Sequence, residues 1–139
     1  TQVTCLAVLS LSVLLTGCES PSGPDRVLEP GIIVGALEDD PQVALTTEGD
    51  SLTVEVTTYG DGCRSKGETR VTLDVDTRSA TVAPFDWSAT EGICTAILNS
   101  FDHSVTLNLE GGGEWTVVVA GTDMQGQSVQ FQFPVLSHQ

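Results

Sequence analysis

Alternating apolar and polar residues are the feature of this sequence that most limits its fold. The apolar positions of five such runs are Leu52/Val54/Val56, Val71/Leu73/Val75, Val105/Leu107/Leu109, Trp115/Val117/Val119 and Val129/Phe131/Phe133. A period of two places these side chains on one face of a β-strand. Together with shorter candidates at 31–37, 43–47 and 80–83, the runs predict an all-β, antiparallel β-sandwich of about seven to eight strands over residues 31–139.

Turn-forming residues separate the runs, notably at 48–50, 59–62 and 111–113. One segment breaks the rhythm, because Ile93, Ile97 and Phe101 recur at intervals of four residues. This spacing fits a short helical turn near residues 93–101, between the sheets, or an irregular strand.

The N-terminal segment is of a different kind, because no charged residue precedes Glu19. Its apolar stretch, residues 3–15, has the length of a signal-peptide core and is too short for a stable bilayer span of about 30 Å. We expect residues 1–17 to be a removable signal peptide. It lacks an initiating Met and a positively charged start, so we expect the leader to be truncated at its N-terminus.

The four residues Leu15-Thr16-Gly17-Cys18 resemble the lipobox of bacterial lipoproteins. The resemblance implies cleavage between Gly17 and Cys18, and acylation of Cys18 as a membrane anchor, each acyl chain adding about 0.8 kcal/mol per buried methylene. It also implies the bacterial cell envelope, on its periplasmic or surface face. Glu19 follows in place of an Asp that can retain such proteins in the inner membrane, which favours the outer membrane. An ordinary secretory leader or a buried strand is the alternative.

Residues 18–30 contain several Pro and Ser residues and little apolar surface, so we expect an acylated Cys followed by a flexible tether of about 20 Å. Residues 31–139 then form a single domain. Within it, residues 109–123 resemble the penultimate-strand region of immunoglobulin-like and PKD-like bacterial extracellular modules. That resemblance implies an Ig-like sandwich and leaves the function open, since such sandwiches have many roles.

Cysteine usage adds to this picture. Cys5 would leave with the signal peptide and Cys18 would be acylated, so Cys63 and Cys94 remain. In an exported domain this pair predicts a disulfide, which would close a loop of about 32 residues and stabilise the fold by roughly 3 to 4 kcal/mol. A reactive or metal-binding thiol pair is the alternative.

Few residues suit catalysis or metal binding. The two histidines are His103, expected on the surface at a strand end, and His138 next to the terminus. A copper site from His103, Met124 and His138 is conceivable, but the three residues have no recognisable ligand spacing. The acidic stretches 38–40 and 74–78 fit solvated loops better than calcium sites. We therefore expect no enzyme activity, no cofactor and no metal. A hydrolase using Asp86 and Glu91 is the least favoured alternative.

Charge and aromatic residues bear on partners. The chain has 5 basic and 19 acidic residues, a net charge of -14, and every basic residue lies between Arg26 and Arg78. Such a chain repels phosphate backbones, so nucleic acid is excluded as a partner, whereas an envelope protein with a basic face would suit it.

The candidate binding patch is Tyr59, Asp61 and Trp87, because Trp87 is predicted in an irregular segment between the two cysteines. Alternatively, Trp87 closes one end of the sandwich against the disulfide. The function expected is a membrane-anchored, non-catalytic binding or structural module. An accessory subunit or inhibitor of an envelope enzyme is the main alternative.

Overall fold

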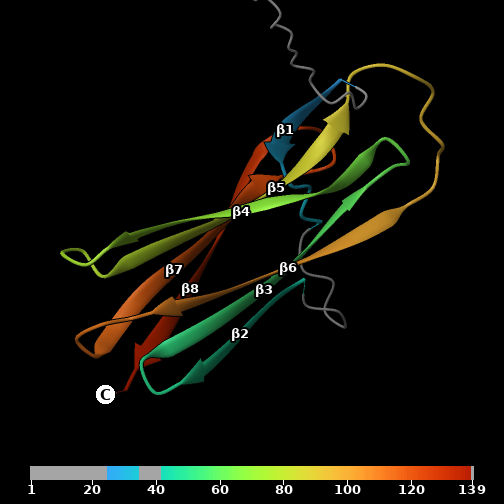
Figure 1. Cartoon of the computed structure of the whole chain (residues 1–139). Helices are drawn as coiled ribbons and strands as arrows, with labels where there is room; N and C mark the ends of the chain where they lie inside the picture. Colours follow the sequence, from blue (N-terminus) through green and yellow to red (C-terminus); the bar gives the residue numbers. More distant parts are fainter. Residues whose placement is uncertain (1–24, 35–41, 139) are drawn as a thin grey trace, which may run out of the picture.

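The computed structural model describes residues 25–34 and 42–138, which form eight strands and no helix (Figure 1). The predicted all-β sandwich is confirmed, and its strand pairs are mostly antiparallel, the exception being β5 with β7. The strands are β1 (Arg26–Pro30), β2 (Val43–Glu48), β3 (Ser51–Gly60), β4 (Arg64–Asp74), β5 (Ser79–Ala89), β6 (Asn99–Asn108), β7 (Gly113–Thr122) and β8 (Ser128–Ser137).

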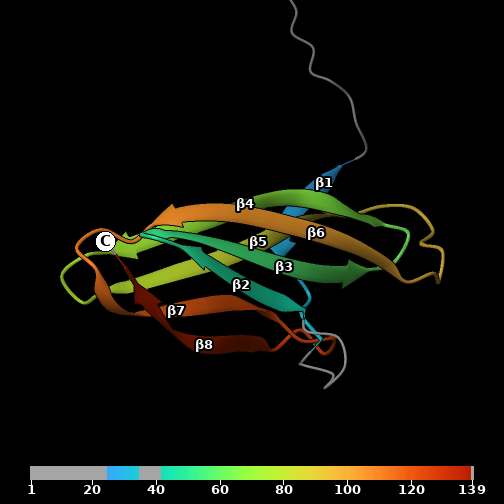
Figure 2. The same ribbon diagram turned by 90° about the horizontal axis from the view of Figure 1, so that it is seen from below.

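The strands belong to two sheets, β2-β3-β6 and a larger one built around β5. One edge of β5 pairs with β4. Its other edge is divided, since β1 pairs antiparallel with residues 85–89 and β7 pairs in parallel with residues 79–82. β8 then pairs with β7. The strands run along one long direction, so the sandwich has two distinct ends (Figure 2).

The two ends are defined by the chain positions that meet there. The tethered end, as we name it, holds Arg26 of β1, Ala89 of β5, Gly60 of β3 and Asn99 of β6. The far end holds Ser79 of β5 and Ser51 of β3, which are the opposite ends of their strands. A ten-residue strand spans about 33 Å, so the ends are well separated.

The core lies between the sheets and follows the predicted alternation. Its buried apolar residues are Ile33, Leu52, Val54, Val56, Ala80, Val82, Leu107, Leu109, Trp115, Val117, Val119 and Val135. Phe131 and Phe133 pack against them and remain partly exposed. Burial of this apolar surface, at about 25 cal/mol per Å², is the main force that holds the two sheets together.

One prediction about chain organisation is wrong, and others concern residues that the structure does not describe. Residues 26–30, expected in the flexible tether, form β1, because they pair with β5 from Arg26 opposite Ala89 to Pro30 opposite Phe85. The signal peptide, Gly17, Cys18 and the acidic stretch 38–40 lie outside the described residues.

The helical turn expected near residues 93–101 is wrong. Residues 93–98 belong to no helix or strand, and β6 already begins at Asn99. The four-residue spacing does not mark a buried helical face, because Ile93 is 98% exposed and Ile97 is exposed as well.

Within residues 25–34 and 42–138, no helix has the length and hydropathy needed to cross a membrane.

Candidate functional site

A disulfide joins Cys63 to Cys94, with the two Cα atoms 5.0 Å apart, so the predicted bridge is confirmed. It ties the β3–β4 turn to residues 92–98, which we call the apolar loop. The backbone N–H of Gly62 also donates to the carbonyl of Thr95, at 3.0 Å. A Cβ at position 62 would collide with the Thr95 side chain, so only glycine allows this close approach.

An apolar groove of about 340 Å³ lies beside this linkage, at the tethered end. Its lining residues are Ile32, Tyr59, Gly60, Asp61, Arg64, Ala96, Ile97, Leu98 and Met124. Ile97, Leu98 and Met124 are largely exposed to solvent. Grouped apolar side chains on a surface mark sites that contact a partner, a ligand or a membrane.

Polar groups stand at one side of the groove. Asp61 is exposed, and its carboxylate accepts a hydrogen bond from the backbone N–H of Cys63 at 2.9 Å, which shapes the turn. Arg64 lines the groove and pairs through Nη2 with Glu29 of β1 at 2.7 Å. This ion pair links the groove to the strand by which the chain enters the domain.

The structure brings together two of the three residues predicted for the binding patch. Tyr59 and Asp61 both line the groove, but Trp87 does not. The prediction that Trp87 lies in an irregular segment is wrong, because β5 continues to Ala89 and pairs there with β1 and β4. Trp87 is half-buried on the outer face of β5, beneath the Arg26 guanidinium at 4.3 Å from the ring centroid.

A cluster of buried polar side chains fills the interior of the tethered end. Asp86 of β5 is fully buried and lies 2.9 Å from Nε2 of His103, from β6. Thr58 of β3 donates its hydroxyl hydrogen to Oδ2 of Asp86, and the N–H of Gly67 lies 3.4 Å from Oδ1. Thr69 of β4 lies 3.0 Å from Nδ1 of His103. Four strands therefore meet through one hydrogen-bond network.

The ionisation of Asp86 follows from these contacts. Burial raises the pKa of Asp86, but the hydrogen bonds from His103 and Thr58 and the charge of His103 outweigh burial and hold the pKa below its ordinary value. Because an ionised carboxylate only accepts hydrogen bonds, Nε2 of His103 carries the hydrogen it shares with Asp86.

The prediction that His103 is a surface residue is wrong, since it is 2% exposed. The sequence does contain a signal for its burial. His103 falls in the same alternating phase as Val105 and Leu107, and Asp86 in the same phase as Val82, so both point towards the core. A polar residue in phase with core residues was the indication that sequence reasoning missed.

The order Thr69, His103, Asp86 is that of a nucleophile, a base and an orienting carboxylate. The side chains of His103 and Asp86 are only 1% and 0% exposed, however, and a substrate must reach the base. A hollow of about 290 Å³ borders His103 but includes neither Thr69 nor Asp86. Glu91 is exposed, so it does not share a buried site with Asp86. The buried network therefore joins β3, β4, β5 and β6.

Metal sites find little support among the residues that the structure describes. Asp61, Cys63 and Cys94 lie within 4.8 Å of one another, but both sulfur atoms belong to the disulfide and offer no thiolate. The copper trio is not brought together. His103 is bound to Asp86, Met124 lines the groove at the tethered end, and the N–H of His138 bonds Gly49 at the far end.

Comparisons of the chain with protein-family models, curated proteins and solved structures found no match. Along β3, Tyr59 points outward to the groove, and its neighbour Thr58 points inward to Asp86. The exposed apolar groove and the buried polar cluster are thus the two sides of one strand end.

Proposed function

We propose that this protein is a lipid-anchored, non-catalytic binding module of the bacterial envelope, whose binding surface is the groove at its tethered end. The observation that carries this proposal is the exposed apolar lining of Ile97, Leu98 and Met124, held in place by the Cys63–Cys94 disulfide. Covering the exposed apolar side chains of one hollow lowers the free energy of the system by about 25 cal/mol per Å² of apolar surface.

The disulfide supports the export part of the proposal, because such bonds persist in oxidising compartments outside the cytosol. The apolar stretch 3–15 and the lipobox-like residues 15–18 support the anchor. Cys18 precedes Asp25, the first described residue, by seven positions. An anchored domain would therefore stay close to its membrane.

The non-catalytic part of the proposal rests on the burial of Asp86 and His103. Their hydrogen bonds to Thr58, Gly67 and Thr69 account for both side chains as structural groups. An accessory subunit or inhibitor of an envelope enzyme is the second candidate. The observation that favours it is the net charge of -14, which suits a partner with a basic face.

The anchor is tested by expressing the chain with a complete leader in bacteria, beside a Cys18→Ala variant. We expect the wild-type protein to begin at Cys18, to carry acyl groups by mass spectrometry and to sediment with membranes. Cys18→Ala should lose the acyl mass. A wild-type protein that begins elsewhere, or that carries no acyl group, would contradict the anchor.

The groove is tested with anilinonaphthalene sulfonate, an anionic fluorescent dye whose aromatic rings bind exposed apolar surface. The variant Ile97→Asp/Leu98→Asp should bind less dye than the wild type. The matched control is Leu73→Asp/Val75→Asp, because these exposed residues lie at the far end. Equal dye binding by both double variants would contradict the groove as the binding surface.

A further inference from the structure

The apolar loop, residues 92–98, combines three properties that do not usually occur together. It contains no charged residue, although the chain as a whole is strongly acidic. Its Ile93 is 98% exposed, and Ile97 and Leu98 are exposed beside it. It projects from the molecule as an arc between β5 and β6 (Figure 1). Nothing among the described residues covers these side chains.

The loop begins at the place where the N-terminal segment joins the domain. The carbonyl of Asp25 accepts hydrogen bonds from both the N–H and the hydroxyl of Thr90, at 3.0 and 3.1 Å. Arg26 then pairs opposite Ala89. Ile93 follows Thr90 by three residues, so it lies within about 11 Å of this junction.

The loop is also held in a fixed position. Cys94 is bonded to Cys63, and the carbonyl of Thr95 accepts the N–H of Gly62. Asn99, where β6 begins, donates from its side-chain amide to the carbonyl of Asp61 at 3.4 Å. Three links to one turn leave little conformational freedom to lose on binding, so the exposed side chains are presented at low entropic cost.

From these observations we infer that the apolar loop sits in the interface of the bilayer to which Cys18 is anchored, with Ile93, Ile97 and Leu98 inserted among the lipids. The inference rests on the proposed anchor, and it names the bilayer as what covers Ile97 and Leu98 of the groove. The seven residue steps from Cys18 to Asp25 span at most about 25 Å, so an acylated Cys18 holds the tethered end against the membrane.

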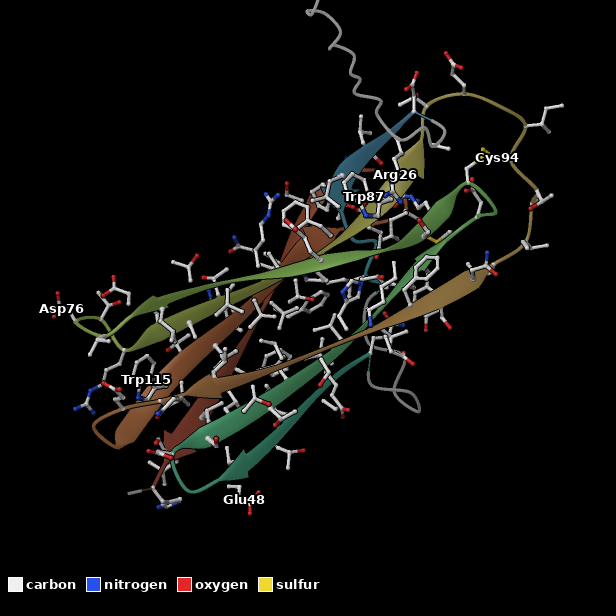
Figure 3. The ribbon with its side chains drawn as sticks, in the orientation of Figure 1. Arg26, Glu48, Asp76, Trp87, Cys94 and Trp115 are labelled. Atoms are coloured by element: carbon white, nitrogen blue, oxygen red, sulfur yellow. A yellow bond between two sulfur atoms is a disulfide. The ribbon has the colours of Figure 1, made fainter. Side chains whose placement is uncertain are left out.

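Charge decides which membrane surface suits this contact. The net charge of -14 repels anionic lipids, whereas an uncharged loop can enter a neutral phosphatidylcholine surface without that cost. The exposed acids of the tethered end, Asp61 and Glu91, lie outside the loop. At the far end the exposed Val75 is flanked by Asp74 and Asp76, and Asp76 lies far from Cys94 (Figure 3). Among the described residues, the tethered end is therefore the one that offers an uncharged, apolar loop to a bilayer.

The test uses the full acylated protein in phosphatidylcholine vesicles with brominated acyl chains, which quench nearby tryptophan. Ile93→Trp adds a tryptophan to the loop, and Val75→Trp adds one to an exposed far-end turn as a matched control. We expect the fluorescence added by Ile93→Trp to fall about twofold or more, since interfacial side chains lie about 5–10 Å into the headgroup boundary. That added by Val75→Trp should not change.

Flotation with the vesicles and the mass of Cys18 are measured first, so that failure of the anchor is recognised separately. If the protein is acylated and floats, but the tryptophan introduced by Ile93→Trp is unquenched and open to aqueous iodide, the inference is overturned and the loop is free for a protein partner. If the introduced tryptophan is unquenched but shielded from iodide, a second copy covers the loop, and the inference is overturned as well.

Discussion

The two ends of the sandwich differ in the side chains that fill their interiors. At the far end, Leu52, Leu109 and Trp115 fill the interior and charged residues face the solvent. At the tethered end, Asp86 and His103 lie in the interior and Ile93 is exposed. An apolar interior serves stability, whereas polar groups in the interior depart from the usual pattern, and such departures are typical of functional or strained regions. The tethered end is therefore the place to test function.

The largest expected effect belongs to the far end. Trp115→Ala should lower the free energy of unfolding by about 3 to 5 kcal/mol, because it removes a large buried side chain and leaves a cavity. Urea denaturation at pH 7 measures it. Trp115→Phe is the control and should cost clearly less, since it keeps most of the apolar surface and removes an indole N–H that has no partner among the described residues. Equal losses would contradict cavity formation.

Removal of the disulfide should have the next largest effect and belongs to the tethered end. Cys63→Ser/Cys94→Ser should lower the free energy of unfolding by about 3 kcal/mol, since the bridge closes a loop with a sequence separation of 31. Urea denaturation of the wild type in a reducing agent should reproduce this loss. An unchanged unfolding midpoint in the double variant would remove the disulfide as a source of stability.

Asp86→Asn tests the buried network. It keeps the shape of the side chain but removes the charge that His103 and Thr58 stabilise. We expect a loss of about 2 to 3 kcal/mol at pH 7, as for other broken buried pairs. Val82→Ala, on the same face of β5, is the control for a purely apolar loss. A loss below that of an exposed substitution would show that the network adds no stability.

The pH dependence of the free energy of unfolding should reflect the ionisation of Asp86 in the same network. The pKa of Asp86 is lower in the folded chain than its ordinary value of 3.8, so its contribution is fully present above that value. The contribution is lost as the pH falls through the lower, folded pKa. The difference between the wild type and Asp86→Asn should therefore shrink below about pH 4. A difference that grows on acidification would contradict the assigned ionised state.

Ile93→Ser should have the smallest effect on stability, within about 0.5 kcal/mol, because the side chain is 98% exposed. Thermal melting measures this. A large loss would mean that the apolar loop packs within the domain, and the contrast between the two ends would then weaken.

Much of the fold was predictable, because alternation determines which residues face the core, and the paired cysteines indicated the disulfide. β1 was not, since the five residues Arg26–Pro30 show no alternating pattern and form a strand only through their pairing with β5. The groove was only partly predictable. Tyr59 and Asp61 were identified, but the exposure of Ile97 and Leu98 depends on a loop conformation that periodicity does not encode. The lipobox, the outer-membrane location and the absence of catalysis remain predictions.

The pairing of β1 with β5 also determines how the domain responds to mechanical force. The chain enters at Arg26, and the five residues of β1 run antiparallel beside the end of β5. A pull on the N-terminal segment along the strand direction loads these backbone hydrogen bonds together, in shear, instead of opening them one after another. β1 is thus placed to hold under load at the point where the chain enters the domain.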